Sequence, residues 1–310
     1  MSEIVDDKSE HCIPFVLSRI EQHRKQYESR GEKPPPFFVG LNGVQGAGKT
    51  TLVTTLSQIL SSPPHDLNAL VLSIDDLYLP HDQQERLASS HPQNPLVQHR
   101  GQPSTHDIAL GAEIFSALDA RMPNIKVPSY DKSAFSGTGD RRPESEWEIL
   151  NHEYRPTVDV IVFEGWCVGF RALTDQDVER KWEAAKQMFE RDGEKYLGQL
   201  GKLQLQDVLF VNQALRGYDV LTDRFGAFVH IDAEDTQYVY AWRLQQEAAL
   251  RVSKGTGMTD EQVVNFVNGY YSAYELYTEV LRHGIFPGQE GKQLRLVVGK
   301  DRRVKEVYKI

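Results

Sequence analysis

The chain has 310 residues, of which 40% are hydrophobic and 25% are charged, and its formal net charge at pH 7 is −9. A chain of this length and composition buries an apolar core in one large domain or two small ones. The acidic balance argues against nucleic acid or an anionic membrane as the main partner. No apolar run approaches the roughly 20 residues that span a bilayer.

Cysteine usage points to the redox state of the compartment. The two cysteines, Cys12 and Cys167, lie far apart in the chain and do not form a disulfide framework. The acidic first residues differ from a secretory signal, which begins with a basic and then an apolar stretch. We therefore expect a reducing compartment, the cytosol first and the nucleus second.

The chain begins with a helical segment and a linker over residues 1–36. Ile13, Val16 and Ile20 recur at helical spacing among polar neighbours, and three consecutive prolines close the segment. The nearly continuous apolar run 37–41 then predicts a buried parallel strand. We expect one domain over residues 37–310.

A glycine-rich motif follows that strand directly. Residues 43–50 match the pattern G-x-x-x-x-G-K-[ST] and open an amphipathic helix. Glycines let the backbone curl around phosphates, and the helix presents its positive end to them. Lys49 is expected to neutralise the β- and γ-phosphates, and the Thr50 hydroxyl to bind Mg²⁺. The residues expected to bind ATP are Gly43, Val44, Gln45, Gly46, Ala47, Gly48, Lys49, Thr50 and Thr51.

Four further apolar runs predict buried strands at 69–74, 158–163, 227–231 and 294–298, separated by helical stretches. This alternation predicts an α/β fold of the P-loop NTPase type, with a mostly parallel central sheet and helices on both faces. Ligands of such sheets bind beyond the carboxyl ends of the strands.

Acidic residues stand at two of these strand ends. Asp75 and Asp76 follow one strand, and either could accept the proton of an acceptor hydroxyl. Glu164 follows another strand and is expected to hold the metal or its water shell. The alternatives are a turn or a helix cap for the aspartates, and a tight turn beside Gly165 for Glu164.

Two segments, 80–106 and 126–157, have the composition of loops over a site. Arg100, Tyr130, Asp131, Lys132 and Arg141 lie in them, and an arginine there could clamp a carboxylate. A solvated surface loop explains the same pattern. Residues 174–224 are expected to form a helical insertion.

A lid is expected over residues 243–258. Arg243, Glu247 and Arg251 share one helical face, which predicts either arginines that reach the transferred phosphate or a surface ion-pair ladder. Glycines 255 and 257 suit a hinge. Thr259 then begins the last long helix with a capping box, and its aromatic stripe predicts core packing.

Seven blocks in this order resemble the plant D-glycerate 3-kinase family and its fungal homologues, within the uridine kinase, pantothenate kinase and phosphoribulokinase group. The blocks are residues 73–78, 100–107, 127–133, 139–141, 163–166, 242–247 and 257–263. The resemblance spans about residues 37–298. It implies Asp75 as the catalytic base, Arg243 in the lid, and acceptor contacts from Asp76, Arg100, Tyr130, Asp131, Lys132 and Arg141.

The sequence thus predicts an ATP- and Mg²⁺-dependent kinase of a small acidic acceptor, with D-glycerate as the first candidate. Ser129, Gln102 and Ser104 depart from the residues usual in the plant family, and all three lie on the acceptor side. A kinase of a nucleoside or another metabolite is the first alternative. A regulatory ATP-binding protein without an acceptor is the second.

Overall fold

The computed structural model describes residues 6–255 and 257–310. In these residues a six-stranded sheet has the order β10-β9-β8-β1-β7-β2. All neighbouring pairs are parallel except β9 and β10. The strands are β1 (Phe37–Gly43), β2 (Ala69–Ser73), β7 (Val160–Gly165), β8 (Ala227–Ala233), β9 (Gln293–Val298) and β10 (Val304–Lys309). The mostly parallel sheet predicted from the sequence is confirmed, and β10 is an addition to it.

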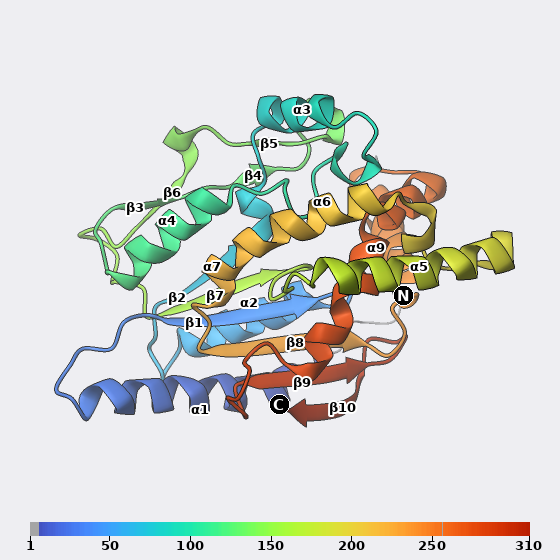
Figure 1. Ribbon diagram of the computed structural model, residues 1–310. Coiled ribbons are helices and arrows are strands. Elements are labelled where there is room, and N and C mark those ends of the chain that lie inside the picture. Colours follow the sequence, from blue (N-terminus) through green and yellow to red (C-terminus); the bar gives the residue numbers. More distant parts are fainter. Residues whose placement is uncertain (1–5, 256) are drawn as a thin grey trace.

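Helices cover both faces of the sheet, as predicted (Figure 1). Phe37 and Phe38 point to opposite faces because side chains alternate along a strand. Phe37 contacts the ring of His23 in α1, with centroids 5.1 Å apart, and Phe38 contacts Phe115 in α4, at 4.9 Å. The helices are α1 (Ser9–Glu28), α2 (Lys49–Leu60), α3 (His81–Ser90), α4 (Ile108–Asp119), α5 (Asp175–Asp192), α6 (Leu205–Leu215), α7 (Asp219–Thr222), α8 (Tyr238–Lys254) and α9 (Asp260–His283).

Some predicted boundaries and loops differ from the structure. The expected strand 69–74 ends at Ser73, and residues 74–77 form a 3-10 helix instead. The segment 80–106 is not all loop, because α3 occupies residues 81–90 with little apolar patterning to predict it. The segment 126–157 contains two small antiparallel pairs. These pairs join β3 (Ile125–Val127) to β6 (Glu148–Leu150), and β4 (Tyr130–Asp131) to β5 (Asp140–Arg141).

Helix α1 is part of the main core rather than a detached segment. Its buried residues Cys12, Phe15, Val16 and Ile20 belong to the same apolar cluster as the sheet. Residues 1–5 of the expected N-terminal segment, and Thr256 in the expected lid, lie outside the described residues. Across the described ranges, no helix combines the length and apolar character needed to cross a membrane.

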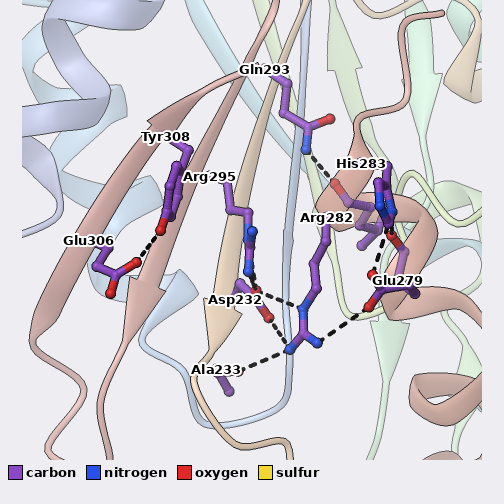
Figure 2. Close-up of polar contacts among 10 residues, drawn as sticks. Asp232, Ala233, Glu279, Arg282, His283, Gln293, Arg295, Glu306 and Tyr308 are labelled. Carbon is purple, nitrogen blue, oxygen red and sulfur yellow. Dashed lines mark hydrogen bonds and ion pairs between the residues drawn. The ribbon is translucent and has the colours of Figure 1, made fainter.

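A buried ion-pair cluster anchors α9 to the sheet (Figure 2). Asp232 at the end of β8 is 2% exposed and receives hydrogen bonds from Arg282 Nε of α9, at 2.9 Å, and from Arg295 Nε of β9, at 2.8 Å. Burial raises the pKa of Asp232, but the two guanidinium groups outweigh it and hold the pKa below its usual value. The cluster therefore ties the last turn of α9 to β8 and, through Asp232, to β9.

Candidate active site

The phosphate loop connects β1 to α2 and needs glycine at two positions. Gly46 has a φ of 84° and Gly48 a φ of 97°, a left-handed conformation that other residues rarely adopt. A Cβ at Gly46 would lie 2.5 Å from the Cβ of Trp242 in α8. The loop therefore packs directly against the first turns of α8, the helix that also carries Arg243.

Lys49 curls back over the loop that precedes it. Its ammonium group donates to the carbonyl of Gly43 at 2.7 Å and of Val44 at 3.4 Å. Burial lowers the pKa of Lys49, and the charges of Glu164 and Asp75 act against this shift. Glu164 is half-buried at the end of β7, the strand between β1 and β2. Lys49 thus lies near the acids that end the two strands beside the phosphate loop.

Residues from both ends of the chain cover the other side of the phosphate loop, and no sequence motif predicts them there. Lys8 is 2% exposed, and its ammonium group donates to the carbonyl of Arg302 at 2.6 Å. Arg302 Nε donates to the carbonyl of Gly46 at 2.7 Å, and its guanidinium lies 5.3 Å from the Trp242 ring centroid. The segment before α1 and the turn before β10 therefore support the donor site.

Asp75 and Asp76 lie in the 3-10 helix after β2 and have different contacts. The Lys132 ammonium group donates to Asp75 Oδ2 at 2.5 Å, whereas Asp76 Oδ1 accepts the backbone N–H of Tyr130 at 3.2 Å. Burial alone would raise the pKa of Asp75, but the Lys132 charge outweighs it and lowers the pKa. Burial and the nearby Asp75 raise the pKa of Asp76. Of the two aspartates, Asp75 is the one whose charge acts on Lys49.

The hairpin of β4 and β5 is fixed over these acids by several of the predicted acceptor residues. Arg100 donates to the carbonyl of Gly137 at 2.8 Å and to that of Thr138. Arg141 donates to Asp107 at 3.1 Å and to the carbonyl of Tyr78 at 2.9 Å. These contacts engage the guanidinium groups with protein oxygens, so both arginines hold the hairpin in position.

Two further hairpin residues have different roles, since Asp131 stabilises a turn and Tyr130 lies in the site. Asp131 accepts the N–H and the hydroxyl of Ser133, at 2.9 and 2.6 Å, and therefore stabilises a turn. Tyr130 lies edge-on to Tyr78, with centroids 5.3 Å apart, and under the guanidinium of Arg100, at 5.5 Å. Its hydroxyl is buried, and no described residue supplies a partner for it.

Arg243, Glu247 and Arg251 share one face of α8, but they differ in their contacts. Glu247 is 4% exposed and accepts the N–H of Met258 at 2.8 Å, and Arg251 donates to the carbonyl of Met258 at 2.7 Å. Both therefore tie α8 to the start of α9. Arg243 donates to Gln246 at 2.9 Å and pairs with Glu247 at 3.5 Å, so this ion pair of the predicted ladder is present. Its guanidinium also lies 5.2 Å from the Phe266 ring centroid, and its Nε is buried without a partner in the described chain.

Aromatic and polar side chains that the sequence did not single out complete the site. The ring of Trp166 lies edge-on to Tyr270 and Tyr274, with centroids 4.8 and 5.6 Å apart, and the Tyr274 hydroxyl accepts the N–H of Gln45 at 3.4 Å. The stripe on α9 is core, as predicted, and also reaches the phosphate loop. Several buried polar atoms around this end lack partners among the described residues: Gln45 Oε1, His106 Nε2, Tyr130 Oη, Arg141 Nε, Trp166 Nε1 and Arg243 Nε.

The oxygen donors present suit a magnesium ion held largely through nucleotide phosphates. Thr50 is exposed at the first turn of α2, and the Glu164 carboxylate lies on the next strand. Within residues 6–255 and 257–310, no three His, Cys, Asp or Glu side chains form a metal site by themselves. Mg²⁺ commonly uses one or two protein oxygens plus water and phosphate, so this donor set fits it.

A phosphate loop after β1, acids at the ends of β7 and β2, and helices on both faces define a P-loop kinase. No protein-family model matches the chain. It is 36% identical over 91% of its length to the uncharacterized kinase mug58 of Schizosaccharomyces pombe, of which it covers 91%. It is also 34% identical over 87% of its length to the chloroplastic D-glycerate 3-kinase of Arabidopsis thaliana, of which it spans about half, 54%.

A solved structure extends the likeness to the whole chain. The D-glycerate 3-kinase of Cryptococcus neoformans superposes with a TM-score of 0.86 at 33% identity, over 99% of this chain and 100% of that one. This chain belongs to the D-glycerate 3-kinase family of P-loop kinases. The family resemblance seen in the sequence is confirmed, and the chain is an ATP-dependent phosphotransferase that acts on an alcohol group.

Proposed function

We propose that this kinase transfers the γ-phosphoryl group of ATP to a hydroxyl of a small acid, with D-glycerate as the leading acceptor. The observation that carries the proposal is the Asp75–Lys132 pair on the Lys49 side of the sheet end. In a hydroxy acid, the hydroxyl group can give its proton to the Asp75 carboxylate, and the acid's own carboxylate can bind the Lys132 cation. The two family members named as D-glycerate 3-kinases support this choice of acceptor.

In this proposal Asp75 is the catalytic base. Its lowered pKa keeps it ionised at neutral pH, so it can accept the proton of the attacking hydroxyl. Asp76 supports the hairpin through its bond to the Tyr130 N–H. Lys49 leaves the carbonyls of Gly43 and Val44 to contact the phosphates, while Arg243 compensates charge on the transferred group.

Thr50 and Glu164 would hold Mg²⁺, which would neutralise negative charge on the phosphates of ATP. The backbone N–H groups from Gly43 to Thr51 would orient the phosphate chain. Lys132 and Tyr130 are proposed as direct acceptor contacts. Arg100, Asp131 and Arg141 would act through the hairpin that they hold in place.

The domain division remains a proposal of the same kind. We assign residues 37–310 to the kinase domain, with acceptor segments 80–106 and 126–157, the insertion 174–224 and the lid 243–258. Residues 1–36 form the N-terminal segment.

The free, buried thiols of Cys12 and Cys167 are consistent with a reducing compartment such as the cytosol.

A panel of acceptors tests the proposal. ADP release is measured with D-glycerate, other hydroxy acids, pantothenate and nucleosides, and Lys49→Ala serves as the blank. D-glycerate is expected to give the largest stimulation. If only a nucleoside stimulates ADP release, the acceptor is a nucleoside and not an acid. If ATP binds but no compound stimulates ADP release, a regulatory ATP-binding protein is favoured.

A further inference from the structure

His106 lies at the end of the segment 80–106, enclosed by aromatic rings. It is 5% exposed and pairs with Tyr78 in an isolated antiparallel bridge. Its ring stacks on that of Tyr78, with centroids 4.4 Å apart and planes at 21°. The ring of Tyr218 meets it edge-on, at 5.7 Å. These contacts leave His106 one fixed ring orientation beside the 3-10 helix that carries Asp75.

The hydrogen bonds of Tyr218 determine which nitrogen of His106 carries the proton. The Tyr218 hydroxyl oxygen accepts the N–H of Ser104 at 3.2 Å and lies 2.7 Å from His106 Nδ1. Burial raises the pKa of Tyr218, so its O–H hydrogen is present and needs an acceptor. The imidazole Nδ1 is the acceptor in reach, and donation to it satisfies every hydrogen of this group.

With Nδ1 as acceptor, the single hydrogen of a neutral imidazole is on Nε2. Burial lowers the pKa of His106 to about 4, against the opposing charge of Asp75, so the ring is neutral under physiological conditions. Nε2 is itself buried, and the described part of the chain supplies no acceptor for it. A buried N–H donor without an acceptor is costly, which favours a ligand atom in that role.

We propose that His106 is an acceptor-binding residue, whose Nε2–H donates a hydrogen bond to an oxygen of the acid that is phosphorylated, and that Tyr218 is the positioning residue that fixes this tautomer. The inference rests on the proposed function and adds a neutral donor to its acceptor site. Tyr218 follows α6, so the helical insertion contributes to acceptor recognition. In this arrangement the Lys132 cation attracts the negatively charged acid, and the hydrogen bond from His106 orients it.

The tautomer is measured directly by ¹⁵N NMR of the histidine rings in the wild-type enzyme, with His106→Gln used to assign the signals. The proposal expects an unprotonated Nδ1 and a protonated Nε2. It also expects the Nε2 signal to shift when the panel acids are added, and to stay in place with ADP alone. A proton on Nδ1, or no response to any panel acid, overturns the proposal. This readout needs no turnover, so it fails separately from the phosphoryl-transfer assay.

Kinetics of matched variants give a second test. His106→Leu is expected to raise KM for the acceptor by about ten- to a hundredfold, the loss of one hydrogen bond to a charged group, with KM for ATP unchanged. His106→Gln retains a donor near the Nε2 position and should stay within about threefold of wild type. His91→Leu, at a ring that contacts Phe210 of α6, is the control. Equal losses for His106→Leu and His106→Gln, or parallel changes in both KM values, would indicate a purely structural role.

Discussion

The ammonium group of Lys132 lies 2.5 Å from Oδ2 of Asp75 and joins the acceptor hairpin to the end of β2. The two residues are 57 positions apart in the chain. Asp75 is 25% exposed and Lys132 57% exposed, so the pair lies at the surface of the site, where an acceptor can reach it. The pair sets both the position of the hairpin and the basicity of the carboxylate.

Lys132→Met should shift the acidic limb of the pH–rate profile to higher pH. Lys132 lowers the pKa of Asp75, so its removal lets burial raise that pKa, and more of the base is protonated at a given pH. We also expect kcat/KM for the acceptor to fall by about ten- to a hundredfold. Lys126→Met is the control, because Lys126 pairs with Glu144 at 2.7 Å on an exposed part of the same segment. An unchanged acidic limb would contradict the assignment of Asp75.

Asp75→Asn and Asp76→Asn should separate the base from its neighbour. Loss of the base is expected to lower kcat by about 10²- to 10⁴-fold and to leave ATP affinity intact. Asp76→Asn keeps an oxygen that can accept the Tyr130 N–H, so its main effect should be a moderate rise in KM for the acceptor. Steady-state kinetics with isothermal titration of ATP measures both. A larger kcat loss for Asp76→Asn would reverse the roles.

Arg243→Met and Arg251→Met test the division of the α8 face. Arg243→Met is expected to lower kcat by about 10²- to 10³-fold, as for other groups that stabilise transition-state charge. Arg251 bonds to Met258 and Asp260 instead, so its replacement should lower the free energy of unfolding by about 1 kcal/mol and leave kcat within about threefold. Steady-state kinetics and thermal unfolding of the two variants distinguish the catalytic role of Arg243 from the structural role of Arg251. Similar kcat losses in both would restore the view that both arginines reach the phosphate.

Gly46→Ala should weaken ATP binding more than backbone strain explains. Its Cβ would lie 2.5 Å from the Cβ of Trp242, so the phosphate loop and α8 must move apart. We expect the Kd for ATP to rise more than about tenfold. Gly31→Ala has the same sign of φ, at 69°, with open space around it, and should cost only about 1–2 kcal/mol of stability. Equal ATP affinity in the two variants would show that the loop tolerates a side chain.

Asp232→Asn should destabilise the protein by about 2–4 kcal/mol, because it leaves two guanidinium groups without their buried counter-charge. Glu279→Gln is the control in the same cluster, since its 3.6 Å pair with Arg282 is exposed (Figure 2). The pKa of Asp232 is lowered in the folded state, so its stabilisation is fully present above the ordinary value of 3.8 and is lost as pH falls through the lowered pKa. Denaturant unfolding at neutral and acidic pH measures both effects.

The sequence predicted the elements whose signals are local. The phosphate loop and the capping box at Thr259 lie where the sequence predicts them, and each of the five predicted strands is present with its bounds shifted by one or two residues. The exposed edge strand β10 and the polar helix α3 were missed, because neither has a strong apolar period. The capping residue Ser73 accepts the N–H of Asp75, which explains why the strand stops one residue earlier than its apolar run.

The phosphate loop that identifies the chain as a nucleotide-binding protein was determined by sequence alone, because its geometry depends on residues that are adjacent in the chain. The partners of each charged side chain were decided only by the tertiary structure. Asp75 meets Lys132, Arg100 and Arg141 hold the hairpin, and Tyr218 fixes the His106 ring because distant segments pack together. A charge pattern along the chain specifies which groups are available, and the packing of β2, the β4–β5 hairpin and the helical insertion determines which of them meet.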